Sequence, residues 1–176
     1  MPALLKSKKP PTQSYEFSMV VAGLDSAARS FEDKLFEAGC SDALIGVVKG
    51  LVVLDFTRQA SSFADALKSA MRDIRKAGGR VVRIEPDSYA SLSDIAARTG
   101  LTRQSVSLLV QGKRGAGSFP PPVARVTSDS PLWDWLIVAR WLTRHGKLKD
   151  TATVTNAEVT RRMNAVIERE RVSSAA

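Results

Sequence analysis

Residues 91–112 read SLSDIAARTGLTRQSVSLLVQG, a pattern that predicts two short helices joined by a tight turn at Gly100. The inward positions of each helix share one face: Ile95, Ala96 and Thr99 in the first, and Val106, Leu109 and Val110 in the second. The small Ala96 permits a close crossing, and Gly100 can adopt the positive φ that the corner needs. Leu101 fills the angle between the helices, and the Thr102 hydroxyl can cap the second one. This spacing predicts a helix-turn-helix.

The outward face of the second predicted helix carries side chains that suit nucleic acid. Arginine and glutamine match the hydrogen-bonding edges of guanine and adenine in the major groove. We expect base contacts from Arg103, Gln104, Ser107 and Gln111. Contacts to the DNA backbone are expected from Thr102, Lys113, Arg114 and Arg125. The alternative interpretation is an αα-hairpin that serves only as core.

The continuation, residues 119–142, reads FPPPVARVTSDSPLWDWLIVARWL and predicts an extended proline segment, a two-stranded wing and a helix. The wing strands are expected at 123–127 and 132–133, and Asp134 is expected to cap the helix. Residues 91–142 resemble the winged-helix module of the MerR and excisionase families, in which a Phe-Pro-x-Pro segment, a wing and a helix ending in Trp-Leu follow the recognition helix. The matching residues are Phe119, Pro120, Pro122, Trp141 and Leu142.

The resemblance implies a DNA-binding winged helix and covers only this part of the chain. The sequence lacks the long C-terminal coiled coil and the metal-ligating cysteines of MerR proteins, which argues against metal sensing. The whole chain is similar to a group of uncharacterised bacterial proteins in which the same module follows an α/β domain.

Residues 15–86 predict such a domain, with the order β-α-β-β-α-β. YEFSMVVAGL alternates as a half-buried strand, ALIGVV and LVVLDF form a hairpin around Lys49-Gly50, and RVVRIE gives the last strand. The first helix is expected from Asp25 or Ser26 to Gly39, and the second is expected to follow Ser61 or Ser62. The order predicts a ferredoxin-like fold, with two helices on one face of a four-stranded antiparallel sheet. The fold class of the whole chain is thus α+β.

The face of that sheet opposite the two helices is left exposed in this fold. Its third strand has Leu51 and Val53 where an RNA-recognition domain places stacking aromatics, so an RNA platform is disfavoured. With Val20, these residues form an aliphatic surface. Either a second copy of the chain or its own C-terminal segment is expected to cover it.

The remaining segments flank the two domains. Residues 1–14 predict a flexible basic arm that either contacts phosphates or only solubilises the chain. Residues 85–88 predict a linker, so the DNA-binding domain is placed at 87–145. In the C-terminal segment, 146–176, a capping box from Thr155 to Glu158 precedes an amphipathic helix that packs on its own chain or on its twin. The apolar face of that helix is assigned to Val159, Met163, Val166 and Ile167.

The charge is distributed unevenly along the chain. The 176 residues have a net charge of +8, but residues 15–90 contain 10 basic and 11 acidic residues. Residues 91–145 contain 7 basic and 3 acidic residues, which favours a polyanionic partner. The chain has no run of eighteen apolar residues and no signal-peptide pattern, so we expect a cytoplasmic protein with no membrane partner.

No group of residues indicates catalysis. The sequence has no paired carboxylates, no nucleophile with a base and no metal-binding cluster, so neither an enzyme nor a cofactor or metal site is expected. Cys40 is expected to be a small buried residue, and His145 a solvated residue near a helix end. The glycine-rich segment 112–117 lacks the ending of a P-loop and is expected to be a mobile phosphate-contacting loop. Core positions are expected for Trp133, Trp135 and Trp141.

These patterns predict a sequence-specific transcriptional regulator that binds double-stranded DNA as a homodimer. One alternative is an interaction protein of the antitoxin or anti-activator type, whose N-terminal domain binds a protein or a small effector. Another is an excisionase-like factor that bends DNA.

Overall fold

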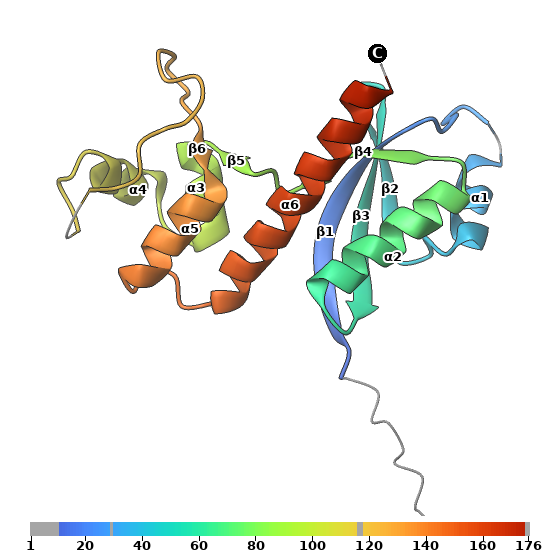
Figure 1. The fold of residues 1–176 in the computed structure, drawn as a ribbon, viewed down its shortest axis with the longest axis horizontal. Coiled ribbons are helices and arrows are strands. Elements are labelled where there is room, and N and C mark those ends of the chain that lie inside the picture. The colour runs from blue at the N-terminus through green and yellow to red at the C-terminus, as the bar shows by residue number, and fades with distance from the viewer. Residues whose placement is uncertain (1–10, 29, 116–117, 175–176) are drawn as a thin grey trace, which may run out of the picture. The chain divides into compact units, whose positions relative to one another are not determined.

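Six α-helices and six β-strands lie within the residues that the structure, a computed structural model, describes: 11–28, 30–115 and 118–174 (Figure 1). The chain is therefore of the mixed α+β class. It divides into two units, Met1–Val82 and Arg83–Ala176. From the sequence, this boundary is expected after Pro86.

The first sheet has four strands: β1 (Gln13–Ala22), β2 (Ala43–Val48), β3 (Leu51–Ala60) and β4 (Arg80–Glu85). Their order across the sheet is β2-β3-β1-β4, and both β1 and β2 pair antiparallel with β3. Lys49 and Gly50 have φ values of 52° and 79°, the positive values that a two-residue hairpin turn needs. The predicted hairpin is confirmed.

Helices α1 (Phe31–Ala38) and α2 (Phe63–Lys76) belong to the same unit (Figure 1). Alternate side chains of β1 and β3 are buried, as the period of two requires. The ring of Phe63 in α2 meets the ring of Phe17 in β1 edge-on, with 5.9 Å between the ring centroids. Helix α2 therefore packs on the face of the sheet that carries these buried side chains. The buried core of the unit includes Phe17, Met19, Val21, Leu35, Val52, Leu54, Phe56, Leu67 and Ile74.

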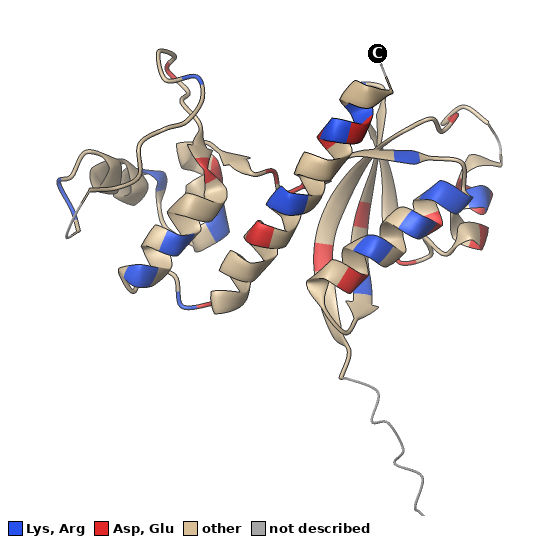
Figure 2. Cartoon of the chain, in the orientation of Figure 1, with Lys and Arg blue, Asp and Glu red and all other residues tan. Residues whose placement is uncertain are grey.

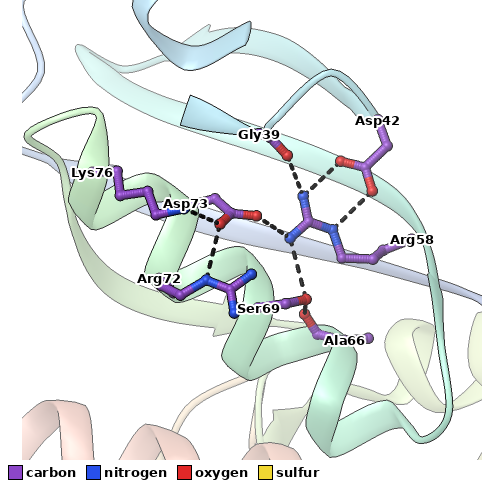
Figure 3. A network of polar contacts seen from close by, with 8 residues as sticks. All are labelled: Gly39, Asp42, Arg58, Ala66, Ser69, Arg72, Asp73 and Lys76. Atoms are coloured by element: carbon purple, nitrogen blue, oxygen red, sulfur yellow. Dashed lines mark hydrogen bonds and ion pairs between the residues drawn. The ribbon is translucent and has the colours of Figure 1, made fainter. Parts of the chain in front are cut away.

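A buried arginine lies between the sheet and α2 (Figure 3). Arg58 of β3 is 6% exposed, and its Nε and Nη2 both donate to the carboxylate of Asp42, at 2.8 and 2.7 Å. Nη2 also donates to the Gly39 carbonyl, while Nη1 donates to Asp73 at 2.8 Å and to Ser69 at 3.2 Å. All five N–H groups of the guanidinium are thus satisfied. The hydrogen bond to Asp42 is the main reason that the pKa of Arg58 is raised.

Two expectations for this unit need correction. Helix α1 begins after Ser30, not at Asp25 or Ser26. The Asp25 carboxylate instead accepts the N–H of Ala27 in a local turn. Strand β1 begins at Gln13, inside the segment assigned to the arm, and the rest of that segment up to residue 10 lies outside the described residues.

The second unit contains β5 (Tyr89–Ala90), α3 (Leu92–Thr99), α4 (Arg103–Val110), β6 (Trp133–Asp134), α5 (Trp135–Arg144) and α6 (Thr151–Ser173). The three tryptophans are core residues, as predicted, at 2–8% exposure. Asp134 caps α5 by accepting the N–H of Ile137, which is also as predicted. The core of this unit includes Ile95, Val106, Leu109, Phe119, Trp133, Trp135, Trp141 and Leu142.

The two strands expected for a wing are not regular. Between 123 and 132 the pairing is one isolated antiparallel bridge, from Ala124 to Leu132. Trp133, expected in the second wing strand, pairs with Ala90 of β5 instead, and its Nε1 donates to the Pro120 carbonyl. A proline has no N–H to donate to a neighbouring strand. The prolines at 120–122 and at 131 therefore limit strand pairing in this region.

Helix α6 begins four residues before the predicted capping box. Asp150 caps it by accepting the N–H of Ala152, and Thr155 lies inside the helix. Its buried face is also different from the prediction, because Val166 is 49% exposed. The buried positions of α6 are Ala157, Thr160, Asn164 and Ile167. None of the helices in the described part of the chain combines the length and the hydropathy that crossing a bilayer requires.

The residues predicted to be a linker are bonded within the second unit. The carbonyl of Asp87 accepts a hydrogen bond from Arg98, and the carbonyl of Ser88 accepts one from the N–H of Trp135. Slightly earlier in the chain, the side chain of Asn164 bonds both main-chain groups of Ile84. The path of the chain into α3 is therefore fixed by hydrogen bonds from residues that follow later in the sequence, both side-chain and main-chain.

Candidate nucleic-acid interface

Both helices of the predicted helix-turn-helix begin with a side-chain cap. Ser91 accepts the N–H of Asp94 and the Asp94 carboxylate accepts the N–H of Ser91, which is a capping box. Thr102 caps α4 by accepting the N–H of Ser105 at 3.1 Å. Between the helices Gly100 has a φ of 71°, as the predicted corner requires. The local geometry of residues 91–110 is thus confirmed.

The pKa of Asp94 reflects this cap. Burial acts to raise it, but the hydrogen bonds from the side chain and the N–H of Ser91 lower it below its usual value. Because these bonds favour the ionised carboxylate, they hold the first turn of α3 together at neutral pH. The carboxylate also lies at the N-terminus of the helix, where negative charge is favourable.

Four of the residues expected to contact bases line one open groove on the outer side of α4. They are Arg103, Gln104, Ser107 and Gln111, and the groove is completed by Leu92 and Leu108. Arg103, Gln104 and Gln111 are exposed, and Ser107 is half-buried. Gln104, Ser107, Leu108 and Gln111 are spaced three or four residues apart and therefore share one face of α4. This spacing explains why their side chains line the same groove.

The two leucines of this groove were not predicted from the sequence. Leu92 also packs against the core of the unit, so its apolar side chain is explained by that packing. Leu108 is half-buried and follows Ser107 on the outer face. The same helical periodicity that selected Gln104 and Gln111 could have identified Leu108, because it is four residues after Gln104.

Two of the polar side chains are already bonded. The Gln111 amide donates to the Ser107 hydroxyl at 3.1 Å, so the two residues hold each other in place across one turn. The Thr102 hydroxyl accepts from the Ser105 N–H and donates to the Ser105 hydroxyl at 2.9 Å. The hydroxyl of Thr102 is therefore used to start α4, in addition to any contact with a phosphate.

The basic residues expected at the DNA backbone lie on two different loops. A basic loop follows α4 (Figure 2). In it, the main-chain N–H groups of Lys113 and Arg114 both donate to the Leu108 carbonyl, which folds the loop against the end of the helix. Arg125 lies on the loop between 123 and 132, with a positive φ of 51°, and does not line the groove. Residues 116 and 117 of the glycine-rich loop lie outside the described residues.

The cations of the second unit differ in whether they have a partner. Arg98 packs over the ring of Trp135, with 5.1 Å between its Cζ and the ring centroid. Burial lowers the pKa of Arg98. Arg140 pairs with Glu158, and Arg161 pairs with Asp134. Among the described residues, no ion pair involves Arg103, Lys113, Arg114 or Arg125. The positive charges around α4 are therefore available to an external anion.

Cys40 and His145, the residues considered for nucleophilic or metal chemistry, both pack against other parts of the fold. Cys40 is 3% exposed, and burial raises the pKa of its thiol to about 11, so it is a weak nucleophile at neutral pH. His145 ends α5, where its ring stacks on Trp141 at 4.0 Å and its Nδ1 contacts the Trp141 carbonyl. Within the described residues, no three acidic, cysteine or histidine side chains gather as metal ligands.

Comparisons of this chain with family models, with curated proteins and with solved structures give no match.

Proposed function

We propose that this protein is a sequence-specific, DNA-binding transcriptional regulator that reads the major groove with α4. The observation that carries the proposal is the groove on the outer side of that helix. Its lining combines the four predicted base-contact residues with an apolar side chain, Leu108. An α-helix fits the major groove of B-DNA, where each base pair presents a distinct pattern of donors, acceptors and methyl groups.

The side chains of the groove suit different base edges. Arg103 can donate two hydrogen bonds to a guanine, and the amide of Gln104 can donate to and accept from an adenine. Leu108 offers an apolar contact to the methyl group of thymine. A half-site of mixed composition is therefore expected, with no preference for uniformly G·C-rich or A·T-rich DNA.

Backbone contacts would hold α4 in register. Lys113 and Arg114 directly follow the helix, and the absence of an ion pair to either within the described residues supports a phosphate-binding role. Arg125 would make a further contact from the loop between 123 and 132. In this proposal that loop is a reduced wing, with one bridge in place of two strands.

The rest of the chain supplies the framework of a two-domain regulator. We assign the first unit to the ferredoxin-like folds, an assignment supported by the element order and by the strand order β2-β3-β1-β4. We assign the second unit to the winged helix-turn-helix proteins. In this proposal the regulator works in the cytoplasm as a homodimer, and the first unit is free to bind an effector.

The test is selection of duplexes from a random DNA pool by the purified chain at near-physiological salt, which suppresses nonspecific attraction. An enriched motif with two inverted half-sites is the expected result. A single half-site would contradict the dimeric part of the proposal. Failure to enrich any sequence would contradict specific DNA binding and favour an antitoxin-like protein whose first unit binds a partner.

The assignment of the groove is tested with the enriched duplex. Gln104→Ala should weaken binding by roughly 5- to 150-fold and relax the preference at one base position, because a good base contact contributes about 1–3 kcal/mol. Gln59→Ala is the matched control, since Gln59 is an exposed glutamine on β3 of the other unit. Equal affinities for the two variants would remove Gln104 from the interface.

A further inference from the structure

The two edges of the four-stranded sheet differ in how their main-chain groups are satisfied. At β4, the Asn164 carboxamide accepts the N–H of Ile84 and donates to its carbonyl, both at 2.9 Å. The β4 sequence RVVRIE also contains three charged residues, which discourage pairing with another strand. At the opposite edge, β2 has the sequence ALIGVV, which contains neither a charged residue nor a proline.

The register of the hairpin identifies the groups that β2 presents outward. The Asp42 carbonyl accepts the N–H of Thr57, so the even-numbered residues from 42 onward direct their main-chain groups toward β3. Ala43, Ile45 and Val47 therefore direct theirs away from the sheet. The N–H of Ala43 bonds the Cys40 carbonyl. For Ile45 and Val47, the described part of the chain provides no partner at this edge.

The side chains of β2 add an apolar surface to this unpaired edge. Leu44 is 77% exposed and Val48 is 54% exposed, and both lie on the same side of the strand as Gly46. Natural sheets usually protect an edge of this kind with charges, prolines or a covering segment. A six-residue strand without such protection is suited to pairing with another strand.

We propose that β2 pairs antiparallel with β2 of a second copy of this chain, with a two-fold axis at Gly46. In this register Ile45 of each copy faces Val47 of the other, and the pair exchanges N–H and C=O hydrogen bonds. The main-chain N–H and C=O groups of Ile45 and Val47, which lack a partner within one described chain, thereby form hydrogen bonds with the second copy. The interaction is self-complementary, as an interface between identical subunits must be.

The proposed register also brings the exposed side chains together. Leu44 of each copy faces Val48 of the other in the closer, non-hydrogen-bonded type of antiparallel pair. Gly46 faces its counterpart on the axis, where the absence of side chains leaves space for the flanking Leu–Val pairs. A β-carbon added at Gly46 would approach only the Val53 carbonyl, at 3.8 Å, so the glycine is not required by the packing within one chain.

The experiment is sedimentation equilibrium of the full chain without DNA, so its outcome is independent of the DNA-binding proposal. The expected result is a monomer–dimer equilibrium that Val47→Pro shifts toward monomer. Proline removes the N–H of Val47, which the hairpin itself does not use, and two such bonds are lost per dimer. We expect the dissociation constant to rise roughly 30-fold, with an unchanged far-UV circular dichroism spectrum.

A charge variant gives a second measurement. Leu44→Lys should weaken the dimer, because it places a charge opposite Val48 of the second copy. Val166→Lys is the matched control, since Val166 is 49% exposed on α6, outside the four-stranded sheet. A monomeric parent chain at all accessible concentrations, or equal effects of the two lysine variants, would overturn the proposal.

Amide hydrogen exchange locates the interface. The exchange of the Ile45 and Val47 amides should slow as the protein concentration is raised. A dimer in which these two amides exchange rapidly at every concentration would place the contact elsewhere, for example on the open face of the sheet, and would also overturn the proposal.

Discussion

Arg58 on β3 and Arg103 on α4 have opposite surroundings. Arg58 is 6% exposed, and its five N–H groups are bonded to Asp42, Asp73, Ser69 and Gly39 (Figure 3). Arg103 is exposed at the start of α4, and no carboxylate within the described residues pairs with it. The same side chain therefore has an internal use in the first unit and is available for an external anion in the second. Net charge alone does not distinguish the two uses.

The buried arginine should give the largest effect. Arg58→Met removes the buried partner of Asp73, which is itself 6% exposed, and we expect the free energy of unfolding of the first unit to fall by about 3–5 kcal/mol. Urea denaturation of the full chain measures this change. Arg72→Met is the control, because Arg72 pairs with the same carboxylate from a side chain that is 65% exposed. That variant should lose less than about 1 kcal/mol, and equal losses would contradict a structural role specific to Arg58.

The available cations should be detected in the salt dependence of DNA binding. Lys113→Ala and Arg114→Ala should each reduce the slope of log K against log salt concentration by about 1, since each removes one phosphate contact. Fluorescence anisotropy with the selected duplex at several salt concentrations measures the slope. Lys68→Ala removes an exposed cation of α2 and should leave the slope unchanged. An unchanged slope in the loop variants would exclude those residues from the interface.

The cap of α3 should have a smaller effect that depends on pH. Ser91→Ala should destabilise the second unit by about 1 kcal/mol at neutral pH, because the N-terminal N–H groups of the helix lose a side-chain acceptor. The pKa of Asp94 is lowered in the folded protein, so its contribution is complete above the unfolded-state pKa of about 3.9 and is lost as the pH falls through the folded-state pKa.

Thermal unfolding from pH 7 down to pH 2 measures this dependence. The difference in stability between the parent and Ser91→Ala should narrow at the acid end of the range without vanishing, because protonation weakens the bond from the Ser91 hydroxyl to the Asp94 carboxylate but not the bond from the Asp94 N–H to that hydroxyl. Ser93→Ala is the control, since Ser93 is exposed in the same turn and does not cap the helix. A constant difference between the parent and Ser91→Ala across this range would show that Asp94 does not contribute through the cap.

The smallest predicted effect concerns the apolar residue of the groove. Replacing thymine by uracil at one position of the half-site should weaken parent binding by roughly 4-fold, because a buried methyl group contributes about 0.8 kcal/mol. Leu108→Ala should bind the thymine and uracil duplexes equally, while Gln104→Ala should keep the difference. If Leu108→Ala still discriminated between the two bases, another side chain would make the methyl contact.

Features specified by neighbouring residues were predicted correctly. The hairpin needed a two-residue turn, and Lys49-Gly50 supplies it. The corner at Gly100 likewise depends only on the positive φ that glycine permits, and the cap at Thr102 depends on a main-chain N–H three residues away. For the same reason, helical periodicity brought the expected base-contact residues of α4 to one groove.

Predictions failed where distant residues compete for the same segment. The second strand of the expected wing is displaced because Trp133 pairs with Ala90 and bonds the Pro120 carbonyl. The start of α6 was misplaced because both Asp150 and Thr155 can cap a helix, and it is Asp150 that accepts the N–H of Ala152. A pattern within a short window does not contain these contacts.

The sequence by itself determined the element order of the first unit, the turn residues and the outer face of α4, since each depends on helical or strand periodicity and on local hydrogen bonds. Tertiary structure alone decided which polar residues became internal. Arg58 is buried because carboxylates from two separate segments meet at its guanidinium, and Asn164 is buried because it bonds Ile84, eighty positions earlier in the chain. Such long-range pairings satisfy buried polar groups, and periodicity within one segment carries no signal for them.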